Sequence, residues 1–193
     1  MIIFDLEATC GDDMNNNEII EIGAVYLDIN FNQPNLMSTF RMFVKPTENS
    51  ILTDFCTKLT TIKQEDLPEN TIFKDAMDWL WDWAKAWHDE DFFFLSWGYY
   101  DRKQIVKEAE RKNIQHPLVD YIKKHHESIK HRFAHVHKCK PCGMMAAMGF
   151  DFINIPYEGT HHRALDDTIN IVKIVKADEL LKADLVKRMK SGR

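Results

Sequence analysis

Short apolar segments near the start of the chain predict three β-strands. Residues 2–6 are mostly aliphatic or aromatic, residues 18–27 are apolar apart from two acids, and residues 38–44 alternate apolar and polar side chains. The segments between them, residues 11–17 and 28–34, are rich in the polar, Gly and Pro residues of loops and turns. Three successive strands with short connections predict an antiparallel meander.

Residues 91–97 form a nearly continuous apolar run, which is typical of a strand buried on both faces. Most of the remaining chain has a helical pattern. Helices are expected over residues 53–59, 63–67, 73–87, 101–112, 116–133, 140–148 and 163–189, the last with a possible break near Asp178. Strands gathered early, followed by one buried strand and then by helices, predict an α/β fold in which helices cover a sheet.

Three tryptophans, Trp79, Trp83 and Trp87, recur at intervals of four residues in the helix expected over residues 73–87. Side chains at this spacing share one face of a helix, so these rings are expected to pack against the core. The alternative is an exposed platform on which nucleic-acid bases stack.

Length and composition narrow the class of protein. The 193 residues suffice for one domain, residues 1–193, with a sizeable core. No apolar run is as long as a membrane span and no signal peptide precedes the first strand, so a cytoplasmic protein without a membrane partner is expected. The four cysteines are expected to be reduced. A net charge of −5 does not indicate a nucleic-acid binder, but a nuclease that holds phosphate through metals concentrates acids in its site.

Two acids, Asp5 and Glu7, occupy alternate positions at the end of the first strand. Successive strand side chains change face, so the two carboxylates point the same way, about 7 Å apart. Like charges near a core are costly unless a cation lies between them, and Mg²⁺ prefers hard oxygen ligands. The strand therefore predicts a metal site; the alternative is a strand end with two solvated acids.

Asp101 follows the buried strand predicted over residues 91–97, at the start of a helix. Functional sites collect at strand ends in open α/β sheets, so an acid at this position is a candidate. The alternative is a helix cap, because Gln104 three residues later completes a variant of the capping box.

A third acid, Asp167, lies near the start of the last helix. On a helical projection Asp167 falls on the apolar side and is turned inward, whereas Asp166 falls with Asn170 on the polar side. His162 lies just before the first turn, close enough in sequence to serve the same pocket. A neutral imidazole beside metals can accept a proton from water. The alternatives are a histidine at a helix start and a solvated acid.

Residues 123–140 contain five lysines, one arginine and five histidines. Such a segment could follow a phosphate backbone or could be a solvated helix face. It also contributes to a possible zinc site formed by His135, His137, Cys139 and Cys142, although their spacing is not that of a known zinc finger. Both questions stay open at this point.

Taken together, these motifs resemble the DEDDh group of 3′-to-5′ exonucleases. The resemblance extends to residues 4–10 (FDLEATC), 18–22 (EIIEI), 43–46 (FVKP) and 52–60 (LTDFCTKLT), and to the His162-x4-Asp167-x2-Asn-Ile pattern. These look like the Eri-type branch, the histone-mRNA 3′-end and small-RNA trimming exonucleases. The motifs occur in order over residues 1–176. The implied fold is a ribonuclease H-like mixed five-stranded sheet, with its first three strands antiparallel, flanked by helices.

The resemblance implies two bound Mg²⁺ ions, for which Mn²⁺ would substitute. Asp5, Glu7 and Asp167 would hold the first ion, and Asp5 with Asp101 the second. His162 would be the general base. These five residues form the implied catalytic set.

The resemblance also assigns a pocket for the terminal nucleoside to Phe55, Leu59 and Tyr100, together with Ala8 and Thr9. Phe55 and Leu59 share a helix face, which suits clamping a base, although plain core packing is the alternative. Tyr100 replaces the tryptophan usual in the family but still offers a stacking ring. The family's Leu-Thr-Gly-Ile becomes LTTI at residues 59–62, a change that touches no implied ligand.

The implied activity is removal of nucleotides from RNA 3′ ends with release of 5′-monophosphates. A DNA exonuclease is an alternative, because the same site serves both polymers and contacts to the 2′-hydroxyl tell them apart. A non-catalytic RNA-binding module is a second alternative, and the presence of all four acids and His162 argues against it. The resemblance implies a monomer. The preference for structured or single-stranded 3′ ends, and the pathway, stay open.

Overall fold

The computed structural model describes residues 1–11, 16–28, 37–87 and 92–191. The loop expected over residues 11–17, the turn over 28–34 and the first residue of the strand over 91–97 therefore lie partly or wholly outside the described residues. No helix in the described part of the chain is long and apolar enough to cross a membrane.

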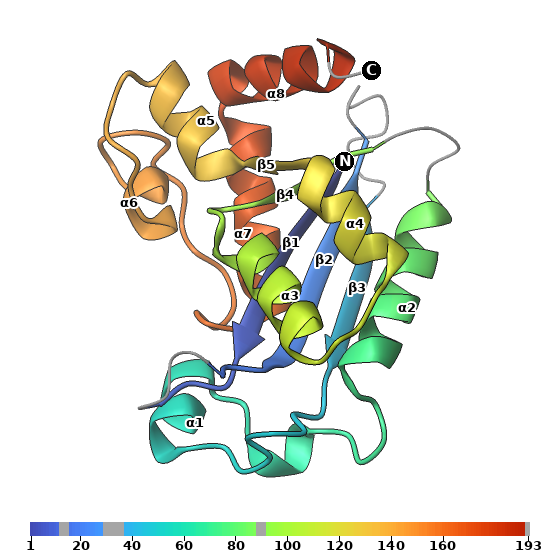
Figure 1. Ribbon diagram of the computed structural model, residues 1–193. Coiled ribbons are helices and arrows are strands. Elements are labelled where there is room, and N and C mark those ends of the chain that lie inside the picture. The colour runs from blue at the N-terminus through green and yellow to red at the C-terminus, as the bar shows by residue number, and fades with distance from the viewer. Residues whose placement is uncertain (12–15, 29–36, 88–91, 192–193) are drawn as a thin grey trace.

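A five-stranded mixed sheet forms the centre of the molecule (Figure 1). Its strands are β1 (Ile2–Ala8), β2 (Ile19–Leu27), β3 (Met37–Phe43), β4 (Phe94–Ser96) and β5 (His126–Ser128), in the spatial order β3-β2-β1-β4-β5. The first three strands are antiparallel, and β4 and β5 continue the sheet parallel to β1. The predicted meander and the implied mixed five-stranded sheet are both confirmed.

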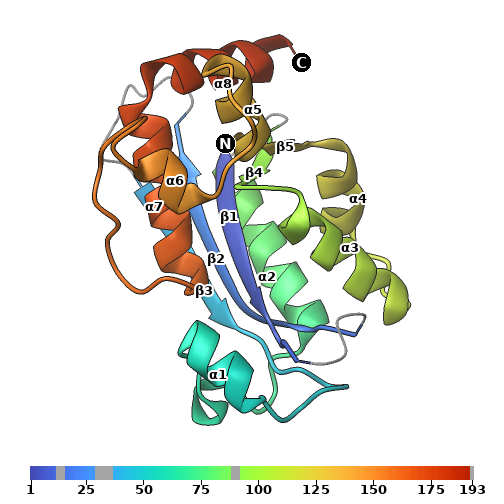
Figure 2. The same cartoon turned by 90° about the vertical axis from the view of Figure 1, so that its left-hand side faces the viewer.

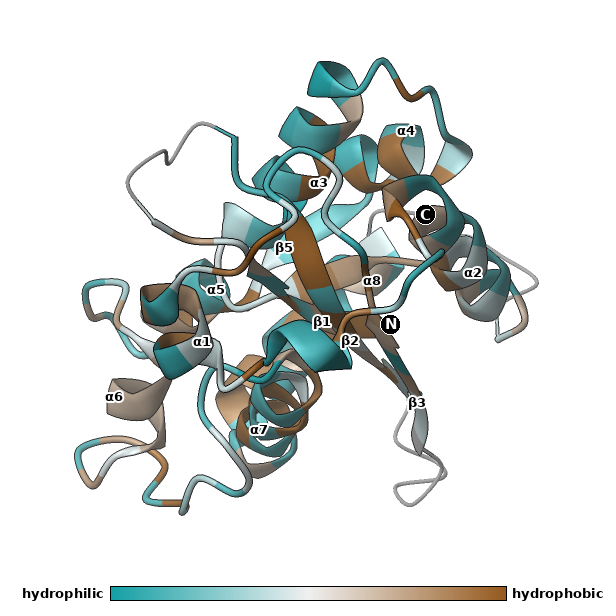
Figure 3. Cartoon of the chain, turned by 90° about the horizontal axis from the view of Figure 1, so that it is seen from below, coloured by the Kyte–Doolittle hydropathy of each residue, from teal (hydrophilic) through white to brown (hydrophobic). Residues whose placement is uncertain are grey.

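Helices cover both faces of this sheet (Figure 2). One face carries α2 (Phe73–Lys85), α3 (Tyr100–Arg111) and α4 (Pro117–Lys124), and the other carries α5 (Ile129–Val136), α6 (Met144–Met148), α7 (Ala164–Ala177) and α8 (Glu179–Ser191). The short α1 (Asp54–Thr60) and a single 3-10 turn (Gln64–Asp66) lie beyond the end of β1. Figure 3 shows apolar colour along the central strands and hydrophilic colour on many outward helix faces.

The alternation of side chains along β1 separates the two cores. Phe4 and Leu6 belong to the core beneath α2, α3 and α4, whereas Ile3 belongs to the core beneath α7. Asp5 and Glu7 continue the side of Ile3 and so point toward the N-terminal end of α7. The expectation that both acids share one face agrees with this arrangement.

Two helix predictions are wrong. The helix expected over residues 116–133 is interrupted by β5, because residues 126–128 pair with β4 and fill the sheet edge. The helix expected over residues 140–148 begins only at Met144, since Gly143 has extended backbone and acts as its N-cap. In both places tertiary pairing or local turn chemistry overrides helical propensity. The break near Asp178, between α7 and α8, is confirmed.

The expected core packing of the tryptophan row is confirmed only for Trp83, which is partly buried and packs against the core beneath α2. Trp79 is 56% exposed and Trp87 is 37% exposed. Trp87 stacks on Tyr26 with ring centroids 5.2 Å apart, and the Trp83 indole donates a hydrogen bond to the Ser38 hydroxyl at 3.2 Å. Trp79 and Trp87 are instead partly exposed to solvent, which suits the amphipathic indole ring.

Candidate active site

The two acids of β1, Asp5 and Glu7, each lie directly opposite a residue of β2. Asp5 is paired with Gly23, and Glu7 with Glu21. The Glu21 carboxylate is already engaged, because it receives hydrogen bonds from Arg41 at 2.7 Å and from the backbone N–H of Ala164 at 3.1 Å. Glu21 therefore belongs to the framework beneath the site, where it ties β2 to β3 and to the start of α7.

Gly23 allows α7 to lie directly on the sheet. A Cβ atom on Gly23 would lie only 2.3 Å from the carbonyl carbon of Ala164, a distance that no real side chain tolerates. The Thr168 hydroxyl is 3.1 Å from the Gly23 carbonyl oxygen and 2.7 Å from that of Ala164. This close approach brings Asp167, one residue before Thr168, over the acids of β1.

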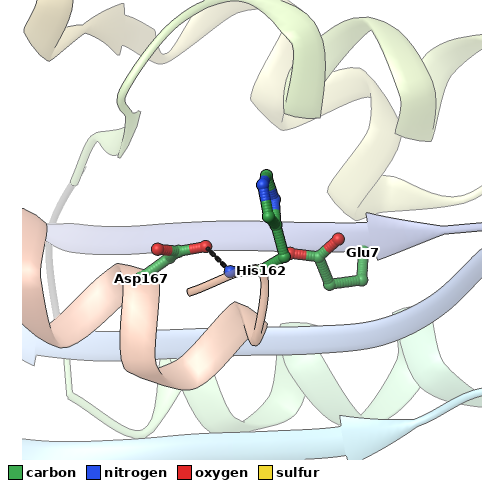
Figure 4. Close-up of side chains that lie close together, drawn as sticks. All are labelled: Glu7, His162 and Asp167. Atoms are coloured by element: carbon green, nitrogen blue, oxygen red, sulfur yellow. Dashed lines mark hydrogen bonds between the residues drawn. The ribbon is translucent and has the colours of Figure 1, made fainter. Parts of the chain in front are cut away.

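Asp167 is buried, and both of its carboxylate oxygens accept hydrogen bonds. The Tyr157 hydroxyl donates to Oδ1 at 2.8 Å. The backbone N–H of His162 donates to Oδ2 at 3.0 Å (Figure 4). His162 has a φ of 61°, a left-handed conformation that is strained for a residue other than glycine. The strained turn places the His162 side chain beside Asp167.

Asp167, Glu7 and His162 offer ligand atoms that all lie within 4.8 Å of one another. Within the described residues this is the single group of three or more His, Cys, Asp or Glu side chains that meets this criterion. Figure 4 shows the three side chains converging beside β1, with Asp167 carried by α7. The expectation that Asp167 is turned inward is confirmed, whereas Asn170, expected on the polar side, is fully buried and bonds to Glu158.

Asp101 lies in the first turn of α3 and is 5% exposed. The cap interpretation is wrong, because the N-cap position is Tyr99 and Gln104 donates its hydrogen bond to the carbonyl of Asn17 at 2.7 Å. Burial raises the pKa of Asp101 to about 6, opposed by a hydrogen bond from Ser96. The negative charge of Asp167 also contributes to this raised pKa.

The acids raise the pKa values of one another. Burial, followed by the charges of Asp101 and Asp167, holds the pKa of Asp5 well above its usual value. Burial and the charge of Asp167 raise the pKa of Glu7 to about 8, and burial also raises the pKa of Asp167. A divalent cation would compensate this repulsion, and the donors are the hard carboxylate oxygens that Mg²⁺ or Mn²⁺ accepts. The residues therefore fit a divalent metal site.

His162 is suited to accept a proton. Partial burial and then the neighbouring His161 lower the pKa of His162, which favours the neutral ring at physiological pH. The His161 and His162 rings lie 4.1 Å apart in an edge-on arrangement, and Nε2 of His161 is 3.9 Å from Oδ1 of Asp167. Sequence reasoning missed His161, Tyr157 and Glu21. The doubled histidine was a visible signal, but no pattern in the sequence indicated the other two.

Two of the expected pocket residues, Phe55 and Leu59, lie on α1, which contacts the end of β1 through Cys56 and the Ala8 carbonyl. Phe55 is 60% exposed and Leu59 is 37% exposed, whereas Cys56 and Thr60 of the same helix are buried. The core alternative for Phe55 and Leu59 is therefore wrong, and α1 presents an exposed apolar face.

The other three expected pocket residues differ in exposure. Tyr100 is half exposed, but Ala8 and Thr9 are buried. The Thr9 hydroxyl accepts a hydrogen bond from the backbone N–H of Glu18 at 2.9 Å. Thr9 also lines a hollow of about 360 Å³ together with Ile51 and Thr53.

The basic segment of residues 123–140 does not form one continuous face, because it is divided among α4, β5 and α5. His126 is buried and Arg132 forms a bidentate ion pair with Asp184 at 2.6 Å. His137 lies 2.6 Å from Asp178. The residues of the possible zinc site, His135, His137, Cys139 and Cys142, do not form a ligand cluster among the described side chains.

Comparison with known proteins agrees with the fold. The nuclease domain of 3′hExo, described as a DEDDh family member bound to rAMP, superposes with a TM-score of 0.78 at 23% identity, covering 99% of this chain and 92% of that one. A 3′-exonuclease in a structure of histone mRNA stem-loop recognition superposes with a TM-score of 0.79 at 22% identity, covering 99% of this chain and 63% of that one. The fold is thus that of the DEDDh nucleases.

The Exonuclease family model, RNase_T, matches residues 2–175, and the chain belongs to this family. The curated relatives include ERI1 exoribonuclease 2 of Xenopus laevis, 26% identical over 90% of this chain and 27% of that protein. They also include the 3′-5′ exonuclease eri1 of Schizosaccharomyces pombe, 24% identical over 91% of this chain and 66% of that protein. The chain spans about a quarter of the length of the first of these relatives.

Proposed function

We propose that the chain is a metal-dependent 3′-to-5′ exoribonuclease that removes nucleotides from RNA 3′ ends and releases nucleoside 5′-monophosphates. The observation that carries the proposal is the convergence of Asp5 and Glu7 from β1, Asp101 from α3, Asp167 from α7 and His162 from the turn before α7. Such a cluster costs folding energy, which a binding module would have no reason to bear. Membership of the Exonuclease family supports the proposal.

The carboxylates are proposed to hold two divalent ions, Mg²⁺ or in its place Mn²⁺. Asp5, Glu7 and Asp167 would hold one ion, and Asp5 with Asp101 the other. When bound, such a pair supplies an activated water and neutralises charge on the attacked phosphate and on the departing 3′ oxygen. Tyr157 and the His162 N–H keep the Asp167 carboxylate in a fixed orientation, since each engages one of its oxygens.

His162 is proposed to take the proton from the attacking water. Its lowered pKa favours the neutral ring, and its position beside Asp167 and Glu7 supports this role. The terminal nucleoside would stack against Phe55, Leu59 and Tyr100, whose exposed side chains offer apolar surface to a base. Ala8 and Thr9 would form the floor of this pocket at the end of β1.

RNA is the proposed substrate because the curated relatives carry exoribonuclease names. A DNA exonuclease is the second candidate, since carboxylates and metals act on the phosphate that both polymers share. We infer a monomer, because residues of one chain build the whole cluster. The four free cysteines are consistent with a reducing compartment, and the cytoplasm is the proposed location.

The experiment that tests this function is a time course on 5′-labelled single-stranded RNA, with Mg²⁺, with Mn²⁺ and with a chelator. A ladder that shortens one nucleotide at a time only when metal is present is the expected result. The same sequence made as DNA, run in parallel, separates the two candidates. If folded protein shortens neither polymer with either metal, the enzyme proposal is wrong.

A further inference from the structure

A hollow on the outer side of α3 and α4 is lined almost entirely by cations. Its lining residues are Arg102, Lys103, Val106, Lys107 and Lys123, and its volume is about 230 Å³. We name it the cationic hollow. Four of its five side chains carry positive charge, so the hollow attracts anions.

The charges of the cationic hollow are mostly uncompensated. Within the described residues, Lys123 pairs with Glu110 at 3.2 Å, but Arg102, Lys103 and Lys107 have no carboxylate partner. The acids on α3 itself do not pair with them. Asp101 and Glu108 are buried, Glu108 pairs with Lys112, and Glu110 faces Lys123. Other cations close to the sheet are paired, as Arg132 is with Asp184. The hollow thus offers positive charge to a partner outside the chain.

One lining residue of the cationic hollow, Arg102, is a sequence neighbour of the candidate active site. Arg102 directly follows Asp101, and its guanidinium lies 5.3 Å from the centroid of the Tyr99 ring. Tyr99 is partly exposed and its ring also lies 4.9 Å from that of His131. An aromatic ring beside an arginine is a surface on which bases stack and phosphates are neutralised.

The direction of the hollow suits a strand whose 3′ end is in the site. The exposed face of α1 lies below the end of β1 in Figure 2, whereas α3 and α4 lie above it and to the right. If the terminal nucleoside contacts α1 and the reacting phosphate lies at the carboxylates, the preceding nucleotides must leave in another direction. Arg102 carries the first cation along that route.

We propose that the cationic hollow binds the phosphates of the nucleotides on the 5′ side of the reacting bond, in a single strand of RNA. Lys103 and Lys107 are one helical turn apart and share a face, so both contact the same strand. This inference rests on the proposed function, because the polarity of the strand follows from it. Its consequence is that oligomers bind more tightly than dinucleotides, through contacts that weaken with salt.

The test compares two double variants. The first carries Lys103→Gln and Lys107→Gln, and the second, the matched control, carries Lys74→Gln and Lys85→Gln. Both pairs are exposed lysines, and the control pair lies on α2, away from the hollow. The substrates are a dinucleotide, which lacks upstream phosphates, and an RNA dodecamer. In the first double variant the ratio of kcat/KM for the dodecamer to that for the dinucleotide should fall about tenfold. The control should keep the ratio of the wild-type protein.

Binding of a fluorescent dodecamer, followed by anisotropy against salt, gives a readout that does not depend on hydrolysis. The slope of log affinity against log salt should decrease by about 1.4 in the first double variant, since each lost contact with a single strand contributes about 0.7. An unchanged substrate ratio together with an unchanged slope overturns the inference, even if the wild-type protein degrades RNA. A wild-type protein that binds RNA but hydrolyses nothing contradicts the proposed function instead, and the slope then still decides the inference.

Discussion

Gly23 on β2 and Ala164 at the start of α7 are in direct backbone contact. A Cβ atom at position 23 would lie 2.3 Å from the Ala164 carbonyl carbon and 2.3 Å from the Leu165 nitrogen. Gly23 is also the cross-strand partner of Asp5. The absence of one side chain on β2 therefore sets the distance between the helix that carries Asp167 and the strand that carries Asp5.

Replacing Gly23 should damage both stability and activity. Because the atoms that a methyl group would meet are backbone atoms, Gly23→Ala must displace α7, and overpacking of this kind costs about 1–3 kcal/mol. Displacing Asp167 by a fraction of an ångström should reduce kcat by tenfold or more. Urea unfolding and a hydrolysis assay measure the two effects. Gly143→Ala is the control, since a Cβ there meets no atom within 4 Å.

Replacing Asp5 should make the metal-free protein more stable and the metal-bound protein less so. Because the pKa of Asp5 is raised in the folded protein, the ionised carboxylate opposes folding. The wild-type protein therefore loses stability as the pH rises through this pKa, whereas Asp5→Asn does not. With a chelator, the melting temperature of the variant should exceed that of the wild-type protein near neutral pH. Addition of Mn²⁺ should raise the wild-type melting temperature and leave the variant nearly unchanged. Asp82→Asn, an exposed acid on α2, should respond like the wild-type protein.

His162 and His161 should differ sharply in their importance. His162→Asn removes the proposed base and should lower kcat by about 10²–10⁴-fold, whereas His161→Asn, at a half-exposed position, should change it only a few-fold. Because the pKa of His162 is lowered, loss of activity through its protonation should occur below its ordinary value of 6.5. Steady-state rates across pH measure both effects. Equal losses in the two variants would contradict the assignment of the base.

Phe55 should affect substrate binding without affecting stability. The side chain is 60% exposed, so Phe55→Ala leaves no buried cavity. Its melting temperature should stay within a few degrees of that of the wild-type protein. Loss of a stacked base should raise KM by about tenfold, which corresponds to about 1–3 kcal/mol per base. Ile72→Ala, at another partly exposed apolar position, should leave KM unchanged. A large loss of stability in Phe55→Ala would indicate instead that this side chain packs in the core.

Glu18 should contribute stability that disappears in acid. Its carboxylate accepts the backbone N–H groups of Thr47, Glu48 and Asn49 and pairs with Lys112 at 2.6 Å. These hydrogen bonds outweigh the effect of burial and lower its pKa from 4.5 to about 2.

A lowered folded-state pKa means that the stabilisation, about 3 kcal/mol, is complete above the unfolded value and is lost as pH falls toward the folded one. Glu18→Gln should therefore be less stable than the wild-type protein near neutral pH. This difference should shrink as the pH falls through the interval between 4.5 and about 2. Urea unfolding at several pH values measures it, and a difference independent of pH would contradict the role of the charge.

Local patterns predicted much of the sheet and several of the helices. The period-two alternation of β1 correctly gave Asp5 and Glu7 one face, and the helical projection correctly turned Asp167 inward. β5 was missed because its three residues lie between two helical segments, and only pairing with β4 makes them a strand. Trp83 packs against the core as predicted, but Trp79 and Trp87 were misjudged, because the spacing fixes a common face but does not say whether a neighbour covers that face.

The sequence by itself determined which side chains could carry charge and protons. It also determined the directions of Asp5, Glu7 and Asp167 within their own elements, because strand and helix periods are local properties of the backbone. Only the tertiary structure decided that these elements meet. Close contact at Gly23, the left-handed turn at His162 and the hydrogen bond from Tyr157 join segments far apart in the chain. The cationic hollow likewise arises only where α3 and α4 pack side by side.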